Sequence, residues 1–169
     1  MALTFTVLEG RFGDSFFIGG VICESSRQGS EMNSVKIVND FWTAVWKARN
    51  PDAIADFVTE DAIITTGGVE VKGRDKFIAW AWEFLSKIND LGFEVLEIFQ
   101  NEDGSRVTTL WCLTGRNNGM MGTAPDQQPI RVTGIAVWSV REDGKLVHNR
   151  VERSAWETFV KLNAGKEQT

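Results

Sequence analysis

Long segments of alternating apolar and polar side chains dominate the C-terminal half of the chain. They comprise residues 93–100, 106–116, 130–141 and 145–154. The first three are rich in β-branched and aromatic residues, which are typical of strands. The turn sequences NEDG and REDGK join neighbouring segments, so two antiparallel pairs are predicted. A sheet of four such strands has a broad apolar face, and the rest of the chain has to cover it.

Helical patterns precede these strands and supply the cover. Apolar side chains recur at helical spacing from Ser34, again after Pro51, and again over residues 74–88. Asn33 or Ser34 can cap the first helix, and Pro51 suits the first turn of the second. The sequence DAIITTGGVEVKG before the third helix predicts a short hairpin. The fold class is therefore α+β: a curved antiparallel sheet wrapped around three N-terminal helices, a cone with an internal pocket.

The first 32 residues are predicted to lie outside this domain. Residues 1–32 form an N-terminal extension, and residues 33–169 form the domain, long enough to bury one core. The apolar run FFIGGVIC is too short for a membrane-spanning helix. Glu9 and Asp14 stand where a signal peptide has basic residues. We therefore expect a cytoplasmic protein that makes no membrane contact.

Composition excludes several kinds of site. The net charge of −5 and the pI near 5.0 argue against a nucleic-acid partner. The chain has no tyrosine, so no mechanism can use a phenolic hydroxyl, and its single histidine excludes a multi-histidine metal site. The two cysteines lie far apart and do not suggest a disulfide framework. We predict no metal and no cofactor.

Three stretches in succession resemble a known family. They are FVTEDAIITTGGVEVKGRDKFIAWAWEFL, LTGRNNGMMGTAPDQQPIRVTGIAVW and EDGKLVHNRVE. The succession resembles the SnoaL-like polyketide cyclases, which belong to the nuclear transport factor 2-like superfamily of cone-shaped α+β folds. The resemblance covers about Ser34 to Phe159. It implies the fold directly, whereas one fold hosts many kinds of site.

Two positions depart from the pattern of the family's cyclases. Their acidic base stands in a Gly-x-Asp-x-aromatic pattern, and here the position of the acid is Ala136. Their histidine stands in a Thr-Gly-x-His-x-Gly pattern, and here that position is Asn117, which is no base near neutral pH. A cyclase mechanism would need a relocated base. Sites resembling those of ketosteroid isomerase, limonene epoxide hydrolase or scytalone dehydratase all use tyrosine, which is absent.

Strand alternation assigns faces on the strand that contains Ala136. If Ala136 faces the pocket, Gly134 and Trp138 do so too. Thr133, Ile135 and Val137 then form an apolar band on the outer face of the sheet. Either the C-terminal tail covers this band or a second copy does, and we favour a homodimer.

The last strand carries a row of ionisable side chains, His148, Arg150 and Glu152, on one face. One interpretation leaves this row in solvent and turns the opposite face inward, with Val147, Asn149, Val151 and Arg153. The other turns the row into the pocket, and the resemblance favours it because Arg150 falls where the family commonly has an inward tryptophan. Glu152 is then the best candidate for a base, with Arg150 as its partner and His148 near the rim.

Further residues are predicted around the pocket. Trp80, Trp111 and Trp138 either line it, which favours a flat apolar or aromatic ligand, or simply pack in the core. Arg116 and Asn117 begin a loop near the pocket mouth, where they could polarise a carbonyl, although Arg116 could equally be a surface charge. In the same loop Met120 and Met121 form either an adaptable lid or an ordinary mobile surface.

Three functions follow from these features. The favoured hypothesis is a cofactor-free cyclase, isomerase or lyase acting on a small hydrophobic, polyketide-like or terpenoid-like molecule, with Glu152 or His148 moving the proton. The second is a non-catalytic pocket protein for a small apolar ligand, which fits the missing acid at Ala136. The third is a structural dimer that uses the outer face of its sheet.

Overall fold

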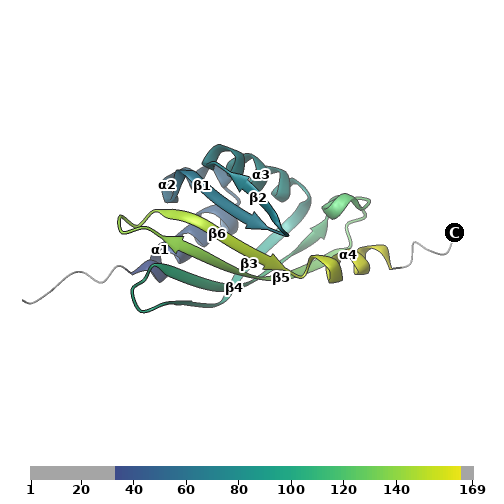
Figure 1. Ribbon diagram of the computed structural model, residues 1–169. Coiled ribbons are helices and arrows are strands. Elements are labelled where there is room, and N and C mark those ends of the chain that lie inside the picture. The colour runs from purple at the N-terminus through teal and green to yellow at the C-terminus, as the bar shows by residue number, and fades with distance from the viewer. Residues whose placement is uncertain (1–32, 165–169) are drawn as a thin grey trace, which may run out of the picture.

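The computed structural model describes residues 33–164. It shows one curved sheet with the first three helices on one face, and the C-terminal helix at the far end of the last strand (Figure 1). The predicted extension, residues 1–32, lies outside the described residues. No helix within residues 33–164 has both the length and the apolar character needed to span a membrane.

The three predicted helices are present. Helix α1 is Ser34–Phe41 and continues as a π-helical turn, Trp42–Lys47; α2 is Ile54–Phe57, preceded by the 3-10 turn Pro51–Ala53; α3 is Arg74–Ser86. Asn33 caps α1, since its side chain accepts a hydrogen bond from the Lys36 backbone N–H at 2.9 Å. Apolar side chains, among them Phe41, Ile54 and Phe77, give each of the three helices a buried face toward the sheet.

Six strands make up the sheet. They are β1 (Val58–Thr66), β2 (Val69–Lys72), β3 (Ile88–Gln100), β4 (Arg106–Asn117), β5 (Pro129–Val140) and β6 (Leu146–Arg153). Their order is β2-β1-β6-β5-β4-β3, and every neighbouring pair is antiparallel except β1 and β6, which run parallel. The sequence did not indicate this one parallel pair, because it joins strands from opposite ends of the domain. It places the β1–β2 hairpin beside the last strand.

Strand β3 is longer than predicted. The helical pattern was expected to run to Ile88 and the strand to begin at Phe93, but α3 ends at Ser86 and Ile88 already pairs with Asn117 on β4. The pairing is irregular between Asn89 and Gly92. Irregular pairing of this kind bends a strand, so it contributes to the curvature that closes the cone.

Helix α4, Ala155–Asn163, packs against β5 and buries Leu162. At the start of α4 the Ser154 hydroxyl accepts a hydrogen bond from the backbone N–H of Thr133 at 3.1 Å. The tail therefore packs at one end of β5, and Ile135 on the outer face of the sheet stays 49% exposed. Pairing of two copies through this face stays a prediction.

Candidate ligand-binding site

The register between β5 and β6 decides which side chains of β6 face the helices. Asn149 pairs with Trp138, and Val151 pairs with Ala136. Residues directly opposite each other in an antiparallel pair share a face. Trp138 and Ala136 are fully buried under the helices, as predicted for that face of β5. The inward row of β6 is therefore Asn149, Val151 and Arg153.

The row His148, Arg150 and Glu152 points the other way. Arg150 and Glu152 are exposed, and His148 is partly exposed on the outer face, where its Nε2 lies 2.9 Å from the hydroxyl of Thr65. The expectation that this row faces the pocket is wrong, and the alternative interpretation of the strand holds. The catalytic roles assigned to the three residues lose the geometry on which they rested.

The error comes from matching Arg150 to the inward tryptophan of the family pattern; a bulge near the start of β6 also breaks the alternation there. The register shift between Ser139 and Val140 leaves Val147 outside the pairing with β5. An extra residue of this kind inverts the alternation of faces beyond it. Leu146 before the bulge and Asn149 after it are accordingly both buried. Counting alternate positions from Leu146 gives the wrong face for the rest of the strand.

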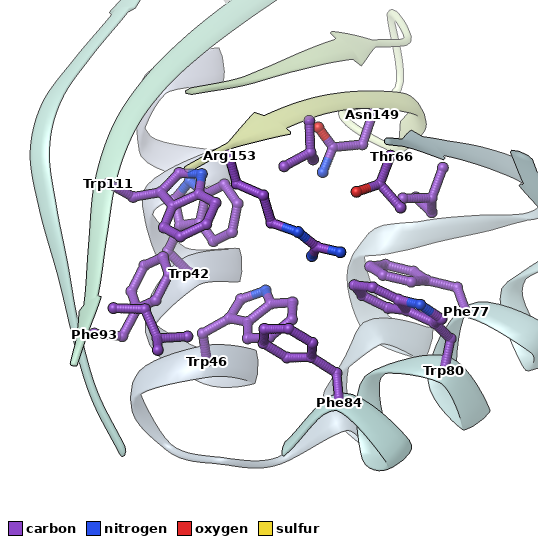
Figure 2. Close-up of a pocket in the computed structure, with 13 residues that line it drawn as sticks. Trp42, Trp46, Thr66, Phe77, Trp80, Phe84, Phe93, Trp111, Asn149 and Arg153 are labelled. Atoms are coloured by element: carbon purple, nitrogen blue, oxygen red, sulfur yellow. The ribbon is translucent and has the colours of Figure 1, made fainter. Parts of the chain in front are cut away.

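Between the sheet and the helices lies a narrow space, here called the hollow, and its walls are mostly aromatic (Figure 2). The seven rings that line it are Trp42, Trp46, Phe77, Trp80, Phe84, Phe93 and Trp111. The space between the lining side chains is about 450 Å³, including its opening to solvent, but the cavity proper is only about 30 Å³. A cavity of that size holds about two waters. A larger ligand would have to displace a side chain.

One wall of the hollow is a stack of three rings. The centroid of Phe93 lies 5.2 Å from that of Trp42 and 5.8 Å from that of Trp111. Trp42 is held by a hydrogen bond from its Nε1 to the Thr109 hydroxyl at 3.1 Å. The Trp111 indole lies across Gly134 of β5, where an added Cβ would clash with the ring. Gly134 therefore leaves the room that this indole occupies.

The opposite wall comes from α3. Phe77, Trp80 and Phe84 follow one another at spacings of three and four, so they share one face of the helix. The ring centroid of Trp80 lies 6.2 Å from that of Phe77 and 5.4 Å from that of Phe84. The Arg153 guanidinium extends between the two walls (Figure 2) and lies 5.3 Å from the Phe84 ring and 5.9 Å from the Trp80 ring.

Arg153 is the one charged side chain among the described residues that line the hollow. Burial lowers the pKa of its guanidinium, and the neighbouring Glu152 carboxylate opposes that shift. An arginine still carries its charge at neutral pH. Within residues 33–164 no hydrogen bond or ion pair reaches this guanidinium, so aromatic faces are its main neighbours. A partly buried cation in this situation attracts an anion.

Four polar atoms of the hollow are buried without a hydrogen-bond partner in the described structure. They are Trp46 Nε1, Trp111 Nε1, Thr66 Oγ1 and Asn149 Oδ1. Leaving such a group unpaired costs about 1–3 kcal/mol, so each is a ready partner for a ligand or a water. The two indoles can only donate, the hydroxyl can do either, and the amide oxygen accepts. This part of the lining therefore suits a ligand with one or two polar atoms.

Four of the predicted binding residues line no part of the hollow, whereas Trp80 and Trp111 do. Ala136 and Trp138 are fully buried, and Trp138 packs edge-on against Phe41 with 5.0 Å between the ring centroids. They belong to the core because the helices cover this stretch of β5.

The prediction that Asn117 and Arg116 line the binding site is also wrong. Asn117 is buried, and its side-chain amide makes five hydrogen bonds of 2.8 to 3.1 Å to residues 119–126, so it holds the loop in shape. Arg116 is exposed and lies 3.6 Å from Asp90, which makes it a surface charge.

A second recess adjoins the hollow and is open to solvent. This outer groove, of about 420 Å³, lies between α3 and the loop after β4, and Glu83, Lys87 and Met121 contribute to its lining. Trp80, Phe84 and Arg153 line both the outer groove and the hollow, so these three residues form the neck between them. Met121 lines the outer groove, whereas Met120 is buried, so the two methionines have different surroundings. A lid role for the loop stays a prediction.

Sequence reasoning missed several lining residues as site residues. Arg153 and Asn149 had been placed on the face of β6 that was not favoured, and Thr66 had been placed only in the hairpin. The apolar Val151 between the first two was the available signal for an inward face. Within residues 33–164 no group of three or more His, Cys, Asp or Glu side chains is arranged to hold a metal ion.

Comparison with solved structures agrees with this architecture. The chain is similar to a proposed SnoaL-like polyketide cyclase from Jannaschia sp., with 19% sequence identity and a TM-score of 0.72 over 82% of this chain and 96% of that one. It is similar to AclR, a proposed hydroxylase from Streptomyces galilaeus, with 19% identity and a TM-score of 0.68 over 79% and 86%. A third is a protein of ketosteroid isomerase-like fold from Catenulispora acidiphila, in complex with trimethylamine, with 16% identity and a TM-score of 0.62 over 76% and 92%.

These likenesses, at such low identity, show the fold alone. They confirm the predicted class, a nuclear transport factor 2-like cone of mixed α+β structure. The SnoaL-like domain family matches residues 38–149, which is more than half of the chain, and the chain belongs to that family. No curated protein sequence matches it.

Proposed function

We propose that this SnoaL-like chain takes up a small, flat, largely apolar molecule in the hollow. The observation that carries the proposal is the lining itself: seven aromatic rings in two walls, interrupted by a few buried polar atoms without partners. Flat apolar ligands gain most from such walls, and the unpaired groups of Trp46, Trp111 and Asn149 supply orientation.

Chemistry is the second candidate function, and Arg153 is the observation that favours it. Membership of the SnoaL-like family supports cofactor-free cyclase or isomerase activity in general. No carboxylate or imidazole stands among the lining residues that the structure describes, so proton transfer would rely on water or on the substrate. What this lining offers is a cation that stabilises negative charge on a carbonyl oxygen as an enolate forms.

Ligand uptake can be tested through the tryptophan indole N–H signals in a ¹⁵N-correlated NMR spectrum. We expect a flat aromatic ketone such as 2-tetralone to shift the signals of Trp46 and Trp111, because their N–H groups are buried in the hollow. Trp156 is 70% exposed on α4 and provides an internal control whose signal should stay in place. A screen of flat apolar compounds that moves neither hollow signal would reject the proposal.

Catalysis has a separate readout in a second sample, prepared in D₂O. In D₂O, an enzyme that stabilises the enolate of 2-tetralone accelerates deuterium incorporation next to the carbonyl, whereas a binding protein does not. Indole shifts without faster exchange would leave ligand binding as the function. Faster exchange would establish the second candidate.

A further inference from the structure

Arg153 occupies an unusual place for a charged side chain. It reaches from the end of β6 into the hollow, it also borders the outer groove, and its guanidinium lies over the rings of Phe84 and Trp80. These rings are where a flat ligand would stack. The cavity proper is small, about 30 Å³, while this guanidinium occupies the space between the walls.

A ligand ring that enters the hollow therefore competes with the guanidinium for the same aromatic faces. No ion pair reaches the guanidinium in the described structure, and the one carboxylate that lines the outer groove, Glu83, is exposed to solvent. The long side chain of Arg153 already spans the neck, so it can turn toward the outer groove without leaving the site. A negatively charged group on the ligand itself, placed at the neck, would provide the missing partner.

We propose that the hollow takes an aromatic acid, with its ring between the two aromatic walls and its carboxylate paired with Arg153 at the neck. This inference rests on the proposed function and specifies the class of ligand. A planar carboxylate matches the fork of a guanidinium, which can donate two parallel hydrogen bonds to it.

The surroundings favour an anion over the opposite charge. Aromatic cages commonly hold cations, but here the protein's own guanidinium fills that role and would repel a second positive charge. In the outer groove, Lys87 adds a second cation near the neck, while Glu83 is exposed to solvent, where its charge is screened. The ligand's charged end thus meets positive charge on its way in.

The test compares two molecules of nearly the same shape, trans-cinnamate and its neutral analogue trans-cinnamamide, by calorimetric titration of the full chain at pH 7. In the wild-type protein we expect cinnamate to bind about tenfold or more tightly than the amide, as one charge-assisted pair predicts. In Arg153→Gln this advantage should fall to about twofold or less, while the amide binds as well as before or better. Arg153→Lys should keep part of the advantage.

The matched control is Arg150→Gln, which removes the same charge from the outward face of the same strand. It should leave the preference for cinnamate unchanged. Equal binding of the two compounds to the wild-type protein, or loss of the preference in both variants, would overturn the inference. In the first of these cases, shifts of the Trp46 and Trp111 signals would show that the proposed function survives. If neither compound binds or moves those signals, the proposed function falls together with the inference.

A second measurement keeps the test independent of the variants' stability. In the wild-type protein the advantage of cinnamate over the amide should shrink as salt is raised, because a pair at the neck is open to the outer groove. An advantage that does not change with salt would count against a charge pair at this position.

Discussion

The two faces of β6 differ in what surrounds them, although their residues alternate along a single strand. The inward row has a buried amide, a valine and a guanidinium, Asn149, Val151 and Arg153, set among aromatic rings. The outward row, His148, Arg150 and Glu152, has more ionisable groups but lies at the surface. By composition alone the outward row looks more like a reaction site.

The difference shows that surroundings decide what a charged group can do. A charge at the surface is hydrated and screened, so its pairings contribute little free energy. A charge that is partly buried between aromatic walls has lost part of its water and makes no ion pair in the described structure, so a partner that arrives is screened less than at the surface. The inward row has fewer ionisable groups than the outward row, but it is the better candidate for ligand recognition.

The largest expected effect comes from adding a charge to the inward row. Asn149→Asp keeps the size of the side chain but buries a carboxylate at a position that is 3% exposed. We expect the free energy of unfolding at pH 7 to fall by about 3 kcal/mol. Burial raises the pKa of such a carboxyl above its unfolded value, so the destabilisation grows as pH rises above about 4 and shrinks below it. Urea unfolding at pH 7 and at pH 4 measures both values.

Glu152→Gln is the matched control on the outward row, because it also exchanges an acid and an amide of equal size. It should change the free energy of unfolding by less than about 0.5 kcal/mol. If the two variants were equally destabilised, the assignment of faces on β6 would be wrong.

The sequence predicted the fold well because the relevant signals are local. Helical spacing on α3 and strand alternation on β4 and β5 depend only on neighbouring residues, and both were interpreted correctly. Trp80 on α3, one of the residues expected to line the pocket, stands in one wall of the hollow. The parallel pairing of β1 with β6 was not foreseen, because it depends on which sheet edge is free once the whole domain has folded.

The site could be predicted only in part, for a related physical reason. Alternation correctly groups Asn149, Val151 and Arg153 on one face of β6, but it does not say which face is buried, and the match of Arg150 to the family's inward tryptophan favoured the wrong one. The lack of a partner for Arg153 is a property of the packed structure. Asn117 was misplaced because its five hydrogen bonds depend on the shape of its own loop, which no spacing rule predicts.

The inward and outward rows of β6 should also differ in their effect on catalysis. If the chain accelerates deuterium exchange of 2-tetralone, Arg153→Gln should lower the accelerated rate by about a hundredfold, the lower end of the usual effect of removing one group that stabilises an oxyanion. The double variant His148→Ala, Glu152→Gln should keep the rate within about twofold, because both side chains point away from the hollow. A rate that depends on His148 and Glu152 and not on Arg153 would mean that the reaction takes place on the outer face of β6.

The smallest effect is on the titration of His148, and it tests whether the two faces are electrically separate. Burial lowers the pKa of this imidazole below its ordinary value, and the nearby positive charge of Arg150 lowers it further. Arg150→Gln should therefore raise this pKa, whereas Arg153→Gln on the inward face should leave it in place. The chain has a single histidine, so its ring proton signal can be followed by NMR without ambiguity.

The same shift sets a direction for stability. Because the folded-state pKa of His148 lies below the unfolded value near 6.5, the unfolded chain binds the proton more readily. The contribution of this group to stability is therefore complete above about pH 6.5 and is lost as pH falls toward the folded-state pKa. Arg150→Gln should weaken this acid sensitivity and Arg153→Gln should not. Equal shifts of the His148 pKa in both variants would mean that the charge inside the hollow reaches the outer face, and that the two rows act as one site.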